Sequence, residues 1–484
     1  MTKWKDLRDW IKIAQNIGEL KEIEGADPNL EISYISQLNA KKLGPALLFK
    51  NIKGFEKSRF RVLTNAVNNL KLFNLTFGLD ENLDFKEVMG YLRNNIKNWE
   101  TYSKNYKIDF VSDSPILENV EENEKLNLLK FPVPIWHEGD GGPYIGTGVG
   151  VITKDPDTGW INVGTYRAQL FDKKTVGINM ERGKHGRLHM EKYFSKGEPM
   201  PIVMVFGPDP LLYVLAGSEV PFGVSELDYE GAIMGESVKA IQGKVTSLPI
   251  PANSEIAVEG FVYPNKTKSE GPHCEWLGYY ASGAQEKPYV DVKALYYRND
   301  AILLGSPTSK GSYNNHAFWR SIWKSALIWG DLDKLGVPGV EGVYAPTFGV
   351  GRQFVVVSIK QLYPGHATEV GYLASQVRSA AYMGKWVVVV DEDVDPYDID
   401  DVLWAICVRA DPAEVAIVKK AWADGTDPLR PKDIPPQYWA NNRGIIFATV
   451  PYERKDTFPT FCAPNKDKIE ETYKKWAGMF SNRW

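Results

Sequence analysis

The pattern of apolar and polar positions divides the chain into three unlike stretches. Residues 1–112 mix amphipathic helical sequence with two short apolar runs, which predicts a small N-terminal α/β domain. Residues 113–305 carry short runs of β-branched and aromatic residues between Gly, Pro and Asp turns, as is typical of a β-rich domain. In residues 306–484 strand and helix patterns alternate, which favours a C-terminal α/β domain.

The N-terminal stretch predicts an amphipathic helix, a turn at 25–28, and a second helix that ends near residue 40. Apolar runs at 45–51 and 58–65 predict two strands, and helical sequence follows to about residue 107. The segment 113–145 is rich in turn residues, so we place the first domain boundary at its start.

The central stretch predicts five strands and one helix, at 185–196. Many strands with few helices must hide their edges, so we expect this sheet to close like a barrel. The predicted strands are 147–153, 160–167, 201–206, 255–263 and 289–298.

The C-terminal stretch begins with a predicted helix at 315–329, which places Phe318, Ile322, Ala326 and Trp329 on one face. The alternation that follows predicts an α/β sandwich. Its predicted elements are a strand at 353–360, a helix at 367–383, a strand at 386–390, a helix at 401–409 and a charged helix at 466–479.

Composition and charge narrow the class of protein. The net charge is −4 and no basic block is present, so the electrostatic footprint of a nucleic-acid binder is missing. No apolar run reaches 18 residues, and the first twenty residues lack the apolar core of a signal peptide, so we expect no membrane span. Three widely spaced cysteines form no disulfide framework, which favours a cytoplasmic location.

His185 and His189, in HGRLH, would share one face of a helix, as the two histidines of an HExxH zinc site do. Gly186 and Arg187 stand where that motif has the catalytic Glu and its neighbour. A metallohydrolase is therefore a rival hypothesis of lower weight.

Two other motifs have simpler structural interpretations. GDGG at 139–142 lacks the P-loop signature and is better explained as a turn. The acidic run 391–401 does not match a calcium loop, and its last aspartates suit the start of the following helix.

Two carboxylates, Glu270 and Glu275, lie five residues apart in the Gly- and aromatic-rich segment SEGPHCEWLGYY. Such a pair on a loop suits proton transfer beside a flat organic molecule. Upstream, Asn162 and Arg167 share a strand segment, where period two points them to opposite faces. A bulge or turn at Gly164 would be needed to bring both to one ligand. A structural ion pair is the simpler interpretation of Arg167 taken alone.

Taken together, these residues resemble the UbiD family of prenylated-FMN-dependent (de)carboxylases, and the resemblance covers nearly the whole chain. His185 follows Arg167 by eighteen residues, and Glu226 lies in the next matching segment. The matching text is NVGTYRAQLFDKKTVGI, SEVPFGVSELDYEGAIMGE, VEGFVYPNKTKSEGPHCEWLGYY and VVVVDEDVDPYDIDDVLWAICVRADP. Departures occur at Lys184, His273 and Cys274, and Tyr166 stands at a position that varies in the family.

The resemblance implies a site for two cations and a flavin. Asn162, His185 and Glu226 would bind Mn²⁺ or Mg²⁺ that holds the cofactor phosphate, a donor set that suits a hard ion. A potassium ion would lie near Val163, Ala216, Ser218 and Glu226, with Arg409 close by. The cofactor-binding residues implied are Asn162, Tyr166, Arg167, Lys184, His185, Ala216, Gly217, Ser218 and Glu226.

The resemblance also implies the catalytic residues Arg167, Glu270 and Glu275. Loss of CO₂ from an sp² carbon requires an organic electron sink, and prenylated FMN serves in this family as a covalent one. Glu275 would be the general acid, which requires a raised pKa. Glu270 and Arg167 would form an ion pair beside the substrate carboxylate.

We therefore expect an N-terminal α/β domain, a central split β-barrel that binds the flavin, and a C-terminal α/β domain that mediates dimers or hexamers. The expected reaction is reversible, non-oxidative (de)carboxylation of an aromatic or α,β-unsaturated acid, with a flavin prenyltransferase supplying the cofactor. The catalytic subunit of a multi-subunit phenol or arene carboxylase is an alternative, as is a non-catalytic flavin-binding subunit. The substrate pocket should lie between the barrel and the C-terminal domain, shaped by segments such as 340–352 and 376–386.

Overall fold

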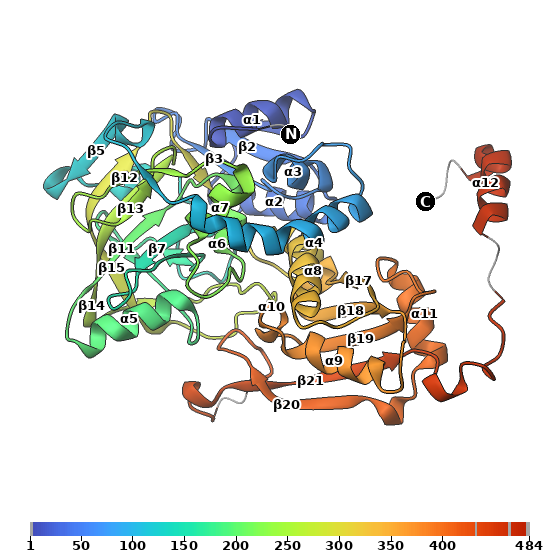
Figure 1. Cartoon of the computed structure of the whole chain (residues 1–484). Coiled ribbons are helices and arrows are strands. Elements are labelled where there is room, and N and C mark those ends of the chain that lie inside the picture. Colours follow the sequence, from blue (N-terminus) through green and yellow to red (C-terminus); the bar gives the residue numbers. More distant parts are fainter. Residues whose placement is uncertain (1–2, 431–432, 463–465, 481–484) are drawn as a thin grey trace.

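The computed structural model describes residues 3–430, 433–462 and 466–480. The N-terminal elements and the central sheet lie side by side, and the C-terminal sheet lies beyond helices α4 and α8 (Figure 1). Helix α12 (Lys466–Phe480) stands apart from the rest of the molecule in this view. In these described ranges, no helix combines the length and apolar character needed to cross a bilayer.

The N-terminal domain is a four-stranded sheet in the order β1-β2-β3-β16, flanked by helices. Its strand β16 (Ile302–Leu304) comes from the far end of the central domain and pairs in parallel with β3. The other elements are α1 (Leu7–Asn16), β1 (Leu20–Glu24), α2 (Glu31–Lys41), β2 (Ala46–Lys50), β3 (Arg61–Thr64), α3 (Leu70–Thr76) and α4 (Phe85–Tyr102).

The sequence prediction for residues 1–40 was incomplete because it missed β1. Only Leu20 and Ile23 are apolar in this strand, and the strand is half-exposed, so its alternating pattern is weak. Parallel pairing with β2 forms it, and that pairing is a tertiary contact that local sequence does not reveal.

The central domain is built on an antiparallel sheet in the order β10-β15-β14-β11-β7-β8, with the short strand β5 (Asn119–Glu122) paired to β15. Five of its strands match the predicted ones. Its path strands are β7 (Gly150–Lys154), β8 (Ile161–Gly164), β10 (Thr175–Gly177), β11 (Met200–Val205), β14 (Ile256–Glu270) and β15 (Gln285–Tyr297). The mixed helix-and-sheet class with N-terminal, central and C-terminal domains is thereby confirmed.

Two irregularities in the pairing of β14 with β15 bend these long strands, one of them at Gly260. A Cβ at Gly260 would lie 2.3 Å from the carbonyl oxygen of Asp291, so only glycine fits this close approach. Small three- and two-stranded sheets complete the domain through β4 (Asp109–Phe110), β6 (Tyr144–Gly146), β9 (Ala168–Gln169), β12 (Lys239–Gln242) and β13 (Pro249–Pro251).

Three helices pack around the edge strand β8, and they position residues of the site. Helix α5 (His185–Ser195) packs on β7, β8 and β11. It matches the helix that the sequence predicted at 185–196. Helices α6 (Pro210–Ala216) and α7 (Glu226–Met234) pack on β8 from the other side. They were not predicted, because both are short and buried on most of their surface, which leaves no amphipathic period to read.

The C-terminal domain has a five-stranded sheet in the order β17-β18-β19-β21-β20. Its inner strands β18 and β19 are the valine-rich runs that the sequence predicted, while β17, β20 and β21 were missed. The predicted helix at 367–383 is interrupted at Val377, whose ψ of 148° is extended. The elements are α8 (Ala317–Lys334), β17 (Val340–Tyr344), β18 (Phe354–Ile359), α9 (His366–Gln376), α10 (Arg378–Ala381), β19 (Trp386–Asp391), α11 (Ile399–Arg409), β20 (Ala416–Trp422) and β21 (Ala440–Ala448).

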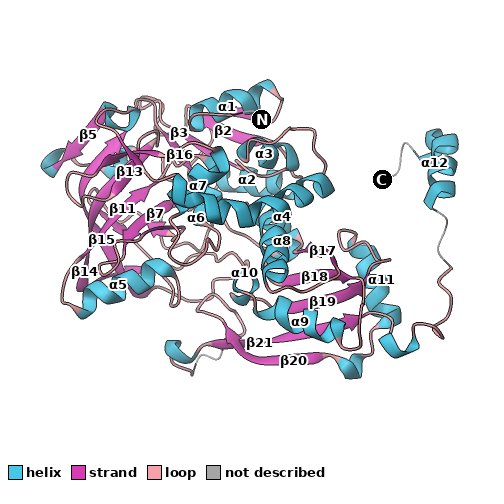
Figure 2. Ribbon diagram, in the orientation of Figure 1, coloured by secondary structure: helices cyan, strands magenta, loops and turns pink. Residues whose placement is uncertain are grey.

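Helix α8 joins the parts of the molecule, because it packs on α4 of the N-terminal domain and on β17 of the C-terminal sheet. Figure 2 shows helices α4, α6, α7 and α8 together between the central and C-terminal sheets. The predicted apolar face of α8 is present, but its opposite face is also buried, including Arg320 and Lys324. Two buried cations in this helix require an explanation from their surroundings.

Candidate active site

A cavity lies between the β8 edge of the central domain and the C-terminal domain, where the sequence placed the substrate pocket. The central domain contributes β8, the segment after it and the starts of α5 and α7. The other wall comes from the start of α8 and from Arg352, Arg378, Tyr382 and Trp422. Segments 340–352 and 376–386 both contribute to this wall, as expected.

Strand β8 ends at Gly164, and the irregular segment after it brings Asn162 and Arg167 to the same cavity. The next strand, β9, begins at Ala168. A Cβ on Gly164 would lie 2.6 Å from the ring of Tyr166, so glycine lets this tyrosine fold back. The departure from period-two alternation is therefore present, as an irregular break at 165–167 between two strands rather than as a turn or bulge at Gly164.

Arg167 lies at the centre of a buried ion-pair network with the two carboxylates of the SEGPHCEWLGYY segment. Its Nε and Nη2 each donate to Glu270 at 2.9 Å, the two-pronged geometry that arginine favours. Its Nη1 donates to Glu275 Oε1. Tyr144, from β6, donates its hydroxyl proton to Glu270 Oε1 at 2.9 Å. The chain thus fixes Glu270 and Arg167 rigidly.

The two glutamates differ in what they face. Arg167 and Glu275 line the cavity, while Glu270 lies behind Arg167 at the end of β14. Burial raises the pKa of Glu275 to about 7, an effect that the Arg167 charge opposes and nearby Asp424 and Glu181 reinforce. A carboxyl group with this pKa can hold a proton near neutral pH and release it to a bound molecule.

Asn162, His185 and Glu226 meet on the same wall of the cavity. His185 Nδ1 lies 3.1 Å from Asn162 Oδ1, and Glu226 Oε2 accepts the backbone N–H of Val163 at 2.5 Å. Burial lowers the pKa of His185 to about 4, so its imidazole is neutral and able to ligate.

Two observations indicate that these residues fit a cation. Burial raises the pKa of Glu226 to about 8, as expected for a buried carboxylate that lacks a counter-charge. The Oδ1 of Asn162 and the Nδ1 of His185 lie 3.1 Å apart on the same wall, so an amide oxygen and a ring nitrogen can reach one ion. No group of three or more His, Cys, Asp and Glu side chains suited to a metal is found over the described ranges. The set of Asn162, His185 and Glu226 is not such a group, because one of its ligands would be the amide oxygen of Asn162.

The other cofactor residues expected from the sequence also reach the cavity: Val163, Tyr166, Lys184, Ala216, Gly217 and Ser218. Tyr166 accepts the N–H of Gly186 at 3.0 Å, and the Lys184 ammonium lies 3.4 Å from the ring centroid of Tyr382. Arg409 does not join them, which corrects its expected place beside the potassium ion. It pairs with Asp391 and Asp393 at the end of α11, on a separate pocket of the C-terminal domain.

His185 and His189 share α5, but they bind different neighbours. His185 lines the cavity beside Asn162, while His189 Nδ1 lies 3.0 Å from Thr153 Oγ1 on β7. Trp160 contacts both rings, at centroid distances of 4.9 and 5.2 Å. The geometry therefore gives no support to a metal shared by the two imidazoles.

His273 and Cys274, which lie between Glu270 and Glu275 in the sequence, have different surroundings in the structure. His273 lines the cavity and packs on Tyr144, and burial lowers its pKa well below the usual value. Cys274 is buried, and its N–H donates to Asp140 Oδ1 at 3.0 Å, which ties the segment to the GDGG turn.

Sequence reasoning missed a group of cavity residues from the C-terminal half: His316, Arg320, Arg352, Arg378 and Tyr382. One signal was available. Arg320 and Lys324 lie four residues apart in AFWRSIWKSALIWG, so two cations share one stripe of an otherwise apolar helix. Two cations on one stripe of an apolar helix indicate that this stripe meets buried polar partners, here the cavity for Arg320 and Glu219 for Lys324.

Comparison with known proteins agrees with this picture. An uncharacterized protein of Aquifex aeolicus is 33% identical over 444 residues, which cover 88% of each chain. Vanillic acid decarboxylase of Sedimentibacter hydroxybenzoicus, in closed form, superposes with a TM-score of 0.84 at 28% identity, over 100% of both chains. An evolved dimeric form of the UbiD-class enzyme HmfF from Pelotomaculum thermopropionicum, in complex with prFMN, gives 0.78 at 26% identity, over 96% of this chain and 98% of that one.

Family models match most of the chain in three consecutive parts. Residues 11–92 match the N-terminal domain, 109–311 the Rift-related domain, and 317–437 the C-terminal domain of 3-octaprenyl-4-hydroxybenzoate carboxy-lyase. With this order of domains and these relatives, the chain belongs to the UbiD family, the 3-octaprenyl-4-hydroxybenzoate carboxy-lyase family.

Proposed function

We propose that this protein is a prenylated-FMN-dependent carboxy-lyase that removes or adds CO₂ on an aromatic or α,β-unsaturated acid. The observation that carries the proposal is the buried Arg167–Glu270–Glu275 network on a cavity shared with Asn162, His185 and Glu226. Family membership and relatives that are decarboxylases support it.

We expect each part of the cofactor to bind in this cavity. Asn162, His185 and Glu226 would hold Mn²⁺ or Mg²⁺ against the flavin phosphate, and Val163, Ala216 and Ser218 would surround K⁺. Lys184 and Arg378, whose charges both act on His185, would neutralise phosphate oxygens. When bound, prenylated FMN supplies the electron sink that loss of CO₂ from an sp² carbon requires.

The chain itself contributes orientation and a proton. Glu270 holds Arg167 through two hydrogen bonds, so the guanidinium presents a fixed edge to the cavity and can orient a substrate carboxylate. After CO₂ departs, the carboxyl proton of Glu275 is transferred to the substrate carbon. Arg167 then stabilises the carboxylate that Glu275 becomes, because the two groups are already in contact.

The pH dependence of turnover should report the protonation of Glu275. Its pKa is about 7, and the acid form is the one that donates, so activity should be full below this pH and fall as pH rises through it. The measurement is kcat for decarboxylation between pH 5.5 and 9 in the holoenzyme. A profile that rises with pH across this range would contradict the assignment.

The direct test of the function is co-expression with a flavin prenyltransferase. We expect a coloured protein with a modified-flavin spectrum, bound manganese by elemental analysis, and CO₂ release from members of a panel of aromatic and acrylic acids. Gel filtration would report the expected homodimer or hexamer. A colourless protein, with no flavin retained after co-expression, would overturn the proposal.

A further inference from the structure

Several cationic side chains line the cavity. One of them, Arg320, has no role in holding the cofactor or the carboxylate that the reaction removes. Arg167 is paired with Glu270 and Glu275, and Arg352 with Glu219 at 2.7 Å. Lys184 and Arg378 lie on the side of His185. Arg320 has no carboxylate within ion-pair distance among the residues that the structure describes.

Arg320 is 93% buried, with 7% of its surface exposed, yet it lines the cavity. Its Nε is buried without a partner, and its Nη2 donates to a neutral group, Nδ1 of His316, at 3.0 Å. Burial and the neighbouring Arg352 lower its pKa to about 9, so it stays charged at neutral pH. A buried, unpaired cation costs stability, and a ligand anion in the cavity would remove that cost.

His316 holds this arginine in place rather than taking part in proton transfer. Its Nε2 lies 3.3 Å from the carbonyl oxygen of Ser306, and a carbonyl only accepts, so Nε2 carries the proton. Its Nδ1 is then the acceptor for Arg320. Because burial lowers the pKa of His316 well below its usual value, the ring remains neutral and both nitrogens are occupied. His316 is therefore a positioning residue.

The helix that carries Arg320 adds to the positive potential. Arg320 lies in the first turns of α8, which begins at Ala317 and is 18 residues long, and the N-terminal end of a helix attracts anions. The wall around it includes Trp276 and Tyr382, which suit an aromatic ring.

We propose that Arg320 binds a second acidic oxygen substituent of the substrate, a carboxylate or an ionised phenol, remote from the carboxylate at Arg167. This inference rests on the proposed function and names its substrate class: aromatic acids with two acidic groups rather than simple monoacids. The guanidinium of Arg320 already lies over the ring of Trp319, 4.9 Å from its centroid, but its Nε still lacks a hydrogen-bond acceptor, which an acidic oxygen supplies and a plain ring does not.

Binding is measured by calorimetry in the flavin-loaded Glu275→Gln protein, which separates affinity from turnover. Benzoate, 4-hydroxybenzoate and terephthalate are the probes, and the last two distinguish a phenol from a second carboxylate. We expect one or both to bind at least about tenfold more tightly than benzoate, as for a charge-assisted contact. Equal affinities for all three probes would overturn the proposal.

Arg320→Met in the same background should abolish that preference while leaving benzoate binding within about threefold, and Arg320→Lys should retain part of it. Without ligand, Arg320→Met should be as thermally stable as its parent or more so, because a buried unpaired charge is gone. An arginine with a purely structural role would instead lose stability and keep the preference. Arg93→Met, at a half-exposed arginine of α4 outside the cavity lining, is the matched control.

Two further outcomes separate this inference from the proposed function. The first outcome is preferential binding that depends on Arg320, with no CO₂ release by the wild-type holoenzyme. It would support the proposed Arg320 subsite and overturn the proposed decarboxylase activity. CO₂ release from monoacids as readily as from diacids, unchanged by Arg320→Lys, supports the decarboxylase and overturns the subsite. Should Arg320→Met not fold, Arg320→Lys and the wild-type series decide between them.

Discussion

Glu275→Gln should retain the bound flavin and lose turnover by roughly 10²- to 10⁴-fold, the usual contribution of a general acid. The amide has nearly the same shape as the carboxyl group and can still accept the hydrogen bond from Arg167 Nη1. It cannot donate an acidic proton to carbon. Single-turnover kinetics should therefore show normal substrate binding with a slow product-forming step.

Glu181→Gln is the matched control, because Glu181 lies on the same cavity wall and pairs with Lys287 at 3.7 Å. The same chemical change there should alter turnover by less than about threefold, as for a carboxylate that is not the proton donor. The pH dependence between 6 and 8 should vanish in Glu275→Gln and persist with a lower midpoint in Glu181→Gln, because the Glu181 charge helps to raise the pKa of Glu275. Full activity of Glu275→Gln would remove this residue from the mechanism.

Sequence reasoning found most of the central sheet and the inner strands of the C-terminal sheet because these strands carry their own signal. The β11 and β19 runs are short, β-branched and bounded by turn residues, so their pattern survives in any context. Strands β20 and β21 were missed, since polar residues interrupt their apolar sequence (KK in AIVKKAW, NNR in ANNRGIIFA) and pairing with neighbouring strands forms them. Their hydrogen bonds join residues that are far apart in the chain.

The residues of the site also fall into those that the sequence predicted and those that only the structure revealed. Asn162, Arg167, His185, Glu226, Glu270 and Glu275 were predicted because they belong to spaced motifs whose resemblance to a family is specific. Arg320 and His316 stand outside those motifs, and only the packing of α8 against the cavity shows that they face it. Charge pairing is likewise invisible in sequence. In the sequence, Glu219 looks like any other carboxylate of a loop. In the structure it is the shared ion-pair partner of two buried cations, Lys324 and Arg352.

Glu219→Gln should destabilise the fold by about 3–5 kcal/mol, the usual cost of leaving a buried charge without its partner. Glu219 lies between α6 and α7 in the central domain, and it accepts from Lys324 on α8 and from Arg352 at 2.7 Å. Lys324 is 1% exposed and Arg352 is 7% exposed. One carboxylate therefore ties the central domain to the C-terminal wall of the cavity, so its loss should also weaken ligand binding.

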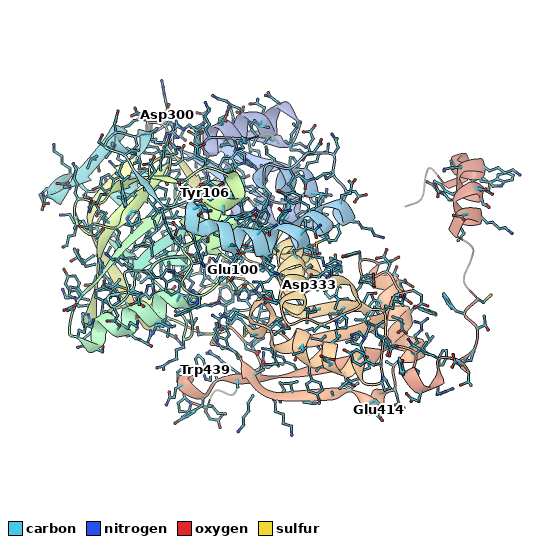
Figure 3. All side chains as sticks on the ribbon, viewed as in Figure 1. Glu100, Tyr106, Asp300, Asp333, Glu414 and Trp439 are labelled. Carbon is cyan, nitrogen blue, oxygen red and sulfur yellow. The ribbon has the colours of Figure 1, made fainter. Side chains whose placement is uncertain are left out.

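Urea unfolding of Glu219→Gln beside Asp333→Asn tests this claim. Asp333, labelled in Figure 3, also forms two hydrogen bonds with an arginine, Arg93, but the side chains of that pair are about one-third exposed. Its loss should cost at most about 1 kcal/mol.

The pH dependence of the same variant gives a second test. Burial and the charge of Arg352 lower the pKa of Lys324 well below its ordinary value in the native protein. Loss of the adjacent Glu219 carboxylate removes a charge that opposes this shift, so in Glu219→Gln the unfolded chain binds the extra proton over a wider pH range. The stability of the variant should then rise with pH above neutrality, as Lys324 sheds its charge in the folded protein. Equal costs for the Glu219 and Asp333 variants, independent of pH, would show that the buried cations do not need their carboxylate.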